Sequence, residues 1–135
     1  MRNTILSNCF SMIVSITALL TGCDDKGNSQ DLIAGSYTLE VTAKHHSWPV
    51  RELSVFLAVD KQQFPGYDSS AYRWKTITDS SGIAAFNRLF PGDYYLYARG
   101  YDSTWGDTVI GYMPLRITAE TQPDNTIEAD LYVSE

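Results

Sequence analysis

The sequence predicts an all-β protein, an antiparallel β-sandwich of about seven short strands. From residue 36 onward, apolar and polar residues alternate with a period of two in successive short segments. Clusters of Gly, Pro, Asp and Ser separate these segments, and no window of useful length has apolar residues at helical spacing. With 135 residues, 44% hydrophobic and 19% charged, the chain has the composition of one globular domain with a real core.

The expected strands share this alternation, and they cover residues 36–43, 53–59, 72–78, 83–89, 93–99, 108–118 and 127–133. In the first strand Tyr37, Leu39 and Val41 share a face, as half-buried strands require. Between the first two strands, Pro49 excludes a central ladder position because proline lacks an amide donor. The third strand leaves two alternatives open: either Ile77 faces inward and Trp74 outward, or Trp74 faces inward and Ile77 is exposed.

The strongest local signal is residues 78–98, TDSSGIAAFNRLFPGDYYLYA. Asp79 to Gly82 supply turn chemistry, because short Asp and Ser side chains bond nearby amides and Gly accepts positive φ. Pro91-Gly92 marks the next reversal, so the stretch predicts a β-hairpin. Alternation places the inner face of this hairpin at Ala84, Phe86, Leu89, Tyr94, Leu96 and Ala98, and it places Tyr95 and Tyr97 on the outer face.

The N-terminus has the form of a secretory signal. Arg2 precedes an apolar run over residues 5–20, which ends in Leu20-Thr21-Gly22-Cys23. This ending resembles the lipobox of bacterial lipoproteins, and the resemblance implies cleavage before Cys23 and lipidation of its sulfur. The expected organisation is a signal peptide over residues 1–22, the lipidated Cys23 with a polar linker over residues 23–35, and a β-sandwich domain over residues 36–135.

Lipidation would leave the folded domain without a free thiol, since Cys9 departs with the signal peptide. Several acyl chains on one residue make a stable membrane anchor. Among Bacteroidota, acidic residues beside the lipidated Cys are common in outer-membrane lipoproteins, so we expect a location in the cell envelope at the outer membrane. An inner-membrane location is the alternative, because Asp24 resembles an enterobacterial retention signal.

Charge argues against nucleic acid as a partner. The formal net charge is −6, and no basic block interrupts the acidic excess. Neutralising phosphates requires clustered Lys and Arg, which this chain lacks.

The order T-D-x-x-G-x-A-x-F-x-x-L-x-P-G-x-Y-x-L over residues 78–96 resembles the immunoglobulin-like or prealbumin-like (transthyretin-like) β-sandwich modules of bacterial envelopes. These include carboxypeptidase regulatory-like domains and the B-type repeats of collagen adhesins. More narrowly, residues 36–135 resemble small lipoproteins of Bacteroidota. The motif is specific for fold and says little about function.

Adhesin B-type repeats often carry an isopeptide bond between a first-strand Lys and a last-strand Asn or Asp, assisted by a Glu. Here Lys44 and either Asn125 or Asp130 stand at matching places, but Ala98 occupies the expected Glu position. Without an acid to shuttle protons the amide should not form, so we expect no isopeptide bond.

Enzymatic signals are weak, and we expect no catalytic residues, no cofactor and no metal site. Adjacent residues on a strand point to opposite faces, so on a strand His45 and His46 could not share a metal. In a loop they could, but a third ligand at suitable spacing is lacking, and both are interpreted as ordinary surface histidines. The C-terminal Tyr-Arg-Gly-Ser signature of hydroxyisourate hydrolases is missing, and no Ser lies in a nucleophile elbow. The sequence DSTWGD at residues 102–107 offers oxygen ligands but lacks the pattern of a calcium loop, and whether it binds Ca²⁺ stays open.

Aromatic residues are the remaining indication of a binding surface, since rings on loops can stack on sugars or fill partner pockets. The candidates are Trp48, Tyr72, Trp74, Tyr95, Tyr97, Tyr101 and Trp105. The sequence thus favours a lipid-anchored envelope module with a structural or protein-interaction role, tethered to the membrane through its N-terminal lipid. The alternative is a glycan-binding module that uses these aromatic residues.

Overall fold

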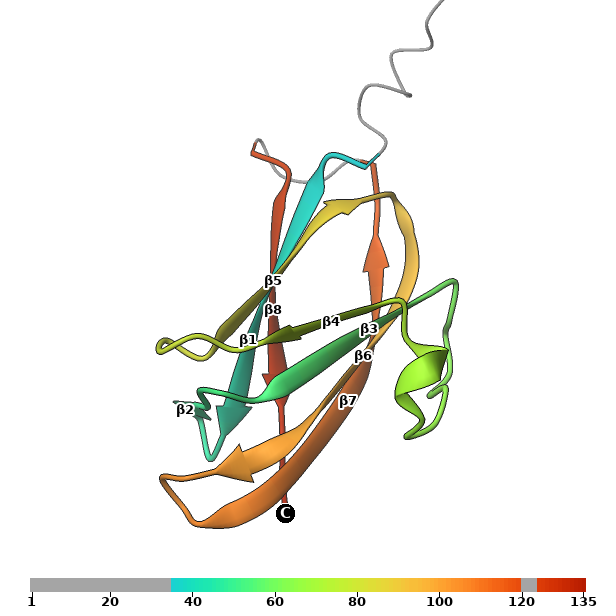
Figure 1. The fold of residues 1–135 in the computed structure, drawn as a ribbon. Helices are drawn as coiled ribbons and strands as arrows, with labels where there is room; N and C mark the ends of the chain where they lie inside the picture. The colour runs from blue at the N-terminus through green and yellow to red at the C-terminus, as the bar shows by residue number, and fades with distance from the viewer. Residues whose placement is uncertain (1–34, 120–123) are drawn as a thin grey trace, which may run out of the picture.

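In the computed structural model, residues 35–119 and 124–135 are described, and they form two β-sheets packed face to face (Figure 1). The elements in chain order are β1 (Tyr37–His45), β2 (Trp48–Pro49), β3 (Ser54–Val59), a 3₁₀ turn (Ser69–Ala71), β4 (Trp74–Ile77), β5 (Ile83–Leu89), β6 (Gly92–Asp102), β7 (Asp107–Ile117) and β8 (Thr126–Tyr132). Apart from Gly35, the expected signal peptide and linker, with Cys23, lie outside the described residues. Within the described part, no helix has the length and apolar character to cross a membrane.

The first sheet is built around β1, which pairs with β5 and the short β2 along one edge and with β8 along the other. The β1–β8 pair is parallel and runs from Thr38↔Thr126 to Lys44↔Tyr132. The expectation of an entirely antiparallel sandwich is therefore wrong at this pair. The cause is the path of the chain: β7 ends at the end of the sandwich where β1 begins, so β8 starts there too and runs in the same direction as β1 (Figure 1).

The second sheet has the order β4-β3-β6-β7, and every pair in it is antiparallel. Its longest ladder joins β6 to β7 from Gly92↔Ile117 to Asp102↔Asp107. A single bridge between Ile110 and Ser134 then connects β7 to the segment after β8, which ties the two sheets together along one side.

The expected hairpin over residues 78–98 is wrong in its pairing. β5 bonds to β1 in the first sheet, whereas β6 bonds to β3 and β7 in the second, so residues 90–91 carry the chain from one sheet to the other. The Tyr94 hydroxyl holds this crossing, because it donates to the Phe90 carbonyl at 2.7 Å and accepts from the Phe90 amide at 3.1 Å. The alternation of apolar and polar residues cannot distinguish a hairpin within one sheet from a crossing between two sheets. Strands that face each other across a core bury the same alternate residues as the two strands of a hairpin do.

The turn before β5 forms as its sequence predicts. Asp79 Oδ1 accepts hydrogen bonds from the amides of Ser81 at 2.8 Å and Ile83 at 3.0 Å. Gly82 has a φ of 77°, and a side chain there would collide with Pro49 at 2.6 Å. Both the left-handed backbone and the close approach therefore require glycine at this position.

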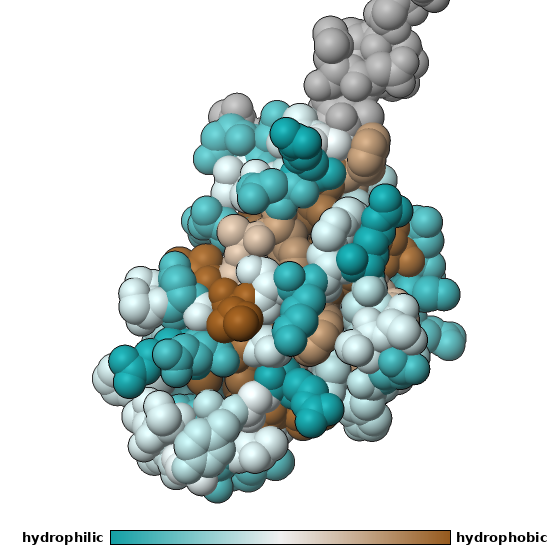
Figure 2. Space-filling model, in the orientation of Figure 1, coloured by the Kyte–Doolittle hydropathy of each residue, from teal (hydrophilic) through white to brown (hydrophobic). Residues whose placement is uncertain are grey.

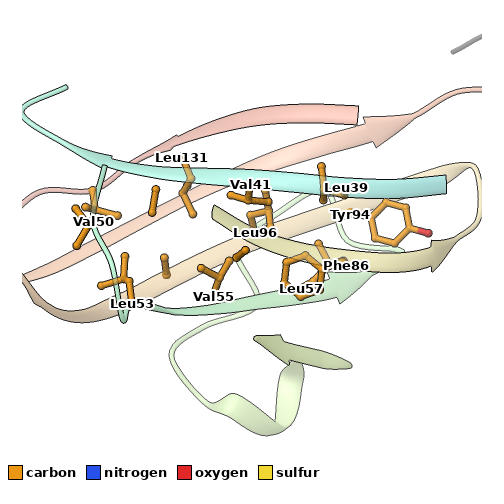
Figure 3. Packing of buried hydrophobic residues seen from close by; sticks show 14 of the residues in the cluster. Leu39, Val41, Val50, Leu53, Val55, Leu57, Phe86, Tyr94, Leu96 and Leu131 are labelled. Atoms are coloured by element: carbon orange, nitrogen blue, oxygen red, sulfur yellow. The ribbon is translucent and has the colours of Figure 1, made fainter. Parts of the chain in front are cut away.

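The main core lies between the two sheets (Figure 3). The predicted inner residues are all buried in it: Ala84, Phe86, Leu89, Tyr94, Leu96 and Ala98. Leu39 and Val41 of β1 face Val55 and Leu57 of β3 across the layer (Figure 3). Of the two alternatives for β4, the second holds, because Trp74 packs against this core and Ile77 is exposed.

Candidate functional site

A second apolar cluster covers the outer face of the second sheet. Its buried members are Phe56, Ala58, Tyr72, Tyr95 and Tyr97, with Phe64 and Ile110 packed against them. We call this cluster the aromatic layer. The ring of Tyr97 is its centre, with centroids 5.4 Å from Phe56, 5.5 Å from Tyr72 and 5.7 Å from Phe64.

The loop between β3 and β4 closes the aromatic layer. At its end, the Arg73 amide donates to the Leu57 carbonyl at 3.0 Å, and the Tyr72 hydroxyl donates to the Gly66 carbonyl at 2.7 Å. Burial raises the pKa of Tyr72 to about 12, so this phenol stays protonated and keeps donating. Tyr97 is only 1% exposed, and its hydroxyl has no hydrogen-bond partner among the described residues.

The aromatic layer corrects the expectation that Tyr95 and Tyr97 form an accessible outer surface. They do point away from the main core, but the loop buries them together with Tyr72. Trp74 is half-buried against the main core. A sequence signal for this second layer exists: the run Val55 to Val59 is apolar without alternation, which is typical of a strand covered on both faces.

The other three candidate aromatics are exposed, and they lie at the end of the sandwich where β1 ends. Trp48 is 67% exposed, Tyr101 61% and Trp105 50%. Trp48 pairs with the last residue of β1, while Tyr101 and Trp105 belong to the β6–β7 hairpin near its tip. On the face seen in Figure 2, hydrophobic surface forms small patches separated by hydrophilic side chains.

At the same end, His45 is 2% exposed and bonded through both ring nitrogens, so its interpretation as a surface histidine is wrong. Nδ1 lies 3.0 Å from Asp102 Oδ2, and Nε2 lies 2.9 Å from Glu135 Oε2. Burial disfavours the imidazolium, but the bonds to the two carboxylates outweigh it and raise the pKa of His45 above its ordinary value. In the doubly protonated form both ring nitrogens donate, which satisfies the ring completely.

Asp102 is buried beside His45 at the end of β6. Its Oδ1 accepts from the Thr104 amide at 2.9 Å, while Oδ2 faces the imidazole. Burial alone would raise the pKa of Asp102, but the hydrogen bonds from the Thr104 amide and from His45 hold that pKa below its usual range. Because both carboxylate oxygens are engaged inside the protein, Asp102 acts as an anchor of this hairpin end rather than as a solvated loop residue.

The backbone brings His46 to the same place. His46 and Ser47 have φ values of 48° and 70°, so they form the two-residue turn between β1 and β2. The turn removes His46 from the strand pattern and sets its ring 4.2 Å from that of His45 and 5.0 Å from that of Trp105, measured between centroids. His45 ends β1 and His46 lies in the turn, so the two rings do not diverge as they would on one continuous strand, and the arrangement is closer to the loop alternative.

Glu135 reaches this end because the segment after β8 is fixed by backbone bonds. The Val133 amide donates to the Lys44 carbonyl at 2.9 Å, and Ser134 exchanges two 2.9 Å bonds with Ile110. The ligand atoms of His45, His46 and Glu135 consequently lie within 4.8 Å of one another. Sequence reasoning missed the roles of Glu135 and Asp102, since neither is near the histidines in the chain and no spacing motif links them.

Lys44 and Asp130 form an ion pair with 2.6 Å between Nζ and Oδ2, on the side of the first sheet that faces solvent. Ala98, where an assisting acid would stand, is buried in the main core. The Lys–Asp pair thus lies on the outer side of the first sheet, whereas the position of the missing acid is on β6 of the second sheet and faces the core. The absence of an isopeptide bond stays a prediction, and this separation supports it.

No protein-family model matches the sequence, and no curated protein matches it. Among solved structures, the major pilin subunit BcpA of Bacillus cereus, in a form carrying D312A, matches with a TM-score of 0.50 and 11% identity over 74% of this chain. The full-length major pilin SpaD of Corynebacterium diphtheriae matches with a TM-score of 0.51 and 13% identity, also over 74%. The chain is similar in fold to pilin domains. It spans about 30% of the length of each of these pilins, so the similarity concerns one sandwich domain.

Proposed function

We propose that this chain is a lipid-anchored β-sandwich module of the bacterial cell envelope with a structural or protein-interaction role and no catalysis. The observation that carries the proposal is the fold, a two-layer sandwich similar to the domains of the pilins BcpA and SpaD. The aromatic layer adds support, because it closes the outer face of one sheet and leaves loops and sandwich ends for contact with partners.

The proposed anchor is Cys23, which follows the lipobox-like Leu20-Thr21-Gly22. The test is metabolic labelling with a clickable fatty acid in cells that express the full chain. Cys23→Ser should lose the label and leave the membrane fraction, while Cys9→Ser, which changes the other cysteine, should keep both. Equal labelling of wild type and Cys23→Ser would refute the anchor. Separation of inner from outer membranes then tests the proposed outer-membrane location.

The proposed interaction role is tested with a photo-cross-linking amino acid placed at Tyr101 or Trp105 in the anchored protein. Both side chains are exposed at the end of the sandwich that carries the β6–β7 hairpin. A discrete cross-linked species is expected from these positions. The control is the same probe at Lys61, an exposed residue on the β3–β4 loop. Identical cross-links from all three positions, or none from any, would argue against a specific contact at this end.

A glycan-binding role is the second candidate, and the exposure of Trp48, Tyr101 and Trp105 at one end of the molecule favours it. Sugar rings stack on exposed aromatic faces, and tryptophan emission responds to such contact. Titration with envelope or dietary polysaccharides should then shift the fluorescence, and Trp105→Phe should remove most of the shift. Unchanged emission with every glycan would leave the protein-interaction role as the surviving proposal.

A further inference from the structure

The chain contains two histidines, and both lie in the cluster at the end of β1. His45 ends β1, His46 begins the turn to β2, and Glu135 arrives from the segment after β8. Their ligand atoms lie within 4.8 Å of one another although Glu135 is separated from His45 by 90 residues in sequence. The fold therefore gathers two imidazoles and one carboxylate from distant parts of the chain.

We propose that His45 Nε2, a ring nitrogen of His46 and a carboxylate oxygen of Glu135 bind one divalent transition-metal ion of the Zn²⁺ type. Two imidazoles and one carboxylate are a ligand set that Zn²⁺ accepts in proteins, with water in the fourth position of a tetrahedron. Imidazole donors favour Zn²⁺, Cu²⁺ and Ni²⁺ over Ca²⁺ and Mg²⁺, which prefer sites made of oxygen atoms.

The distances between the proposed ligand atoms fit a tetrahedral Zn²⁺ site after small movements of the side chains. His45 Nε2 and Glu135 Oε2 are 2.9 Å apart, and tetrahedral ligands at about 2.0–2.2 Å from Zn²⁺ stand roughly 3.3 Å from each other. The pair must therefore open by a few tenths of an ångström. His46 and Glu135 are exposed, so their side chains can rotate toward the ion, while the buried His45 supplies the fixed reference point.

Asp102 supplies the feature that separates this cluster from three polar side chains gathered by chance. Its Oδ2 lies 3.0 Å from His45 Nδ1, which fixes the tautomer that leaves Nε2 as the metal-binding atom. A carboxylate behind a metal-binding histidine also raises the basicity of the imidazole. Here that carboxylate is itself buried and held by the Thr104 amide, so the histidine is oriented before any metal arrives.

Charge favours a cation at the same point. Two carboxylates, Asp102 and Glu135, flank the single ring of His45. When the metal-free ring is protonated on both nitrogens, Nε2 donates its proton in the hydrogen bond to Glu135. When the ion binds, this proton leaves to solvent and the ion takes its place between the same two atoms. The bound ion would join the end of β1 to the C-terminal segment, and Asp102 would connect the β6–β7 hairpin to this centre through His45.

The experiment uses the full chain in detergent, without a polyhistidine tag and after treatment with a chelator. Calorimetric titration with ZnCl₂ should show one ion per chain, and saturating Zn²⁺ should raise the Tm by roughly 5 °C or more. His46→Asn should weaken binding at least tenfold. Asparagine suits the positive φ of this turn, so that variant keeps its fold and its metal-free Tm.

Two further variants test the contribution of each carboxylate. Glu135→Gln removes an exposed ligand and should also weaken Zn²⁺ binding at least tenfold. Asp102→Asn should lower affinity by about 10- to 100-fold, as expected for a group behind a metal ligand. In a spectrum of ¹⁵N-labelled imidazoles, Zn²⁺ should shift His45 Nε2 in the wild type, and CaCl₂ should leave it unchanged.

Cysteine is the competing ligand, and Cys9→Ser/Cys23→Ser addresses it. The proposal requires that this double variant bind Zn²⁺ as tightly as the wild type. Absence of one-to-one binding would overturn the site. So would binding that survives both His46→Asn and Glu135→Gln with unchanged affinity, or an unshifted His45 Nε2 signal at saturating Zn²⁺.

Discussion

Tyr97→Phe should stabilise the protein, because the Tyr97 hydroxyl is buried without a hydrogen-bond partner among the described residues. A buried polar group left unsatisfied costs about 1–3 kcal/mol. The substitution removes that cost and retains the ring, whose contacts with Phe56 and Tyr72 are the stacked ones of the aromatic layer. We expect the free energy of unfolding to rise by about 1 kcal/mol, at the low end of that range.

The matched control is Tyr72→Phe, which removes a hydroxyl from the neighbouring ring. That hydroxyl donates to the Gly66 carbonyl at 2.7 Å, so its loss should lower the free energy of unfolding by about 0.5–1.5 kcal/mol. Urea denaturation of the full chain measures both: the midpoint should rise by roughly 0.5 M for Tyr97→Phe and fall for Tyr72→Phe. A lower midpoint for Tyr97→Phe would refute the reasoning, since the hydroxyl would then make a stabilising contact.

Three further predictions concern the core, a strand contact and a surface ion pair. Phe86→Ala should lower the free energy of unfolding by about 3–5 kcal/mol, and an unchanged denaturation midpoint would contradict its place in the main core. Gly111→Ala puts a Cβ against the Tyr132 carbonyl oxygen, so the two strands must separate; we expect a loss of about 1–3 kcal/mol and faster amide exchange after β8. The hydrogen bond from Arg116 holds the pKa of Asp93 below 3.8, so this pair stabilises the fold above that pH and its contribution disappears as the pH falls through the lowered pKa. Urea midpoints of wild type and Asp93→Asn should therefore differ at neutral pH and converge in acid.

Much of the fold follows from alternation alone. The inner residues of β5 and β6, such as Phe86 and Leu96, lie where a period of two predicts them. Strand pairing cannot be predicted from alternation, because it depends on which strands become neighbours in the fold. The same buried set fits a hairpin and a crossing between sheets, and only the hydrogen bonds of Tyr94 to Phe90 and the registers of β5 and β6 decide.

The candidate site was less accessible to sequence reasoning. Exposure of Trp48 and Trp105 agrees with their position in or beside turns, but burial of Tyr95 and Tyr97 depends on a loop that folds back over the sheet. The sequence predicts His45 at the surface, yet its ring is buried against Asp102 at the end of β6 and Glu135 in the segment after β8. Contacts between residues so far apart in the chain leave no local sequence pattern from which they could be predicted.

The parallel pairing of β1 with β8 has a mechanical consequence. The chain enters β1 at one end of the sandwich and leaves after β8 at the opposite end (Figure 1). A pull between these two points loads the β1–β8 ladder lengthwise, so the hydrogen bonds from Thr38 to Lys44 share the load instead of opening one at a time. A tether on the N-terminal side and a load on the C-terminal side would therefore pull this ladder in shear and not peel it open from one end.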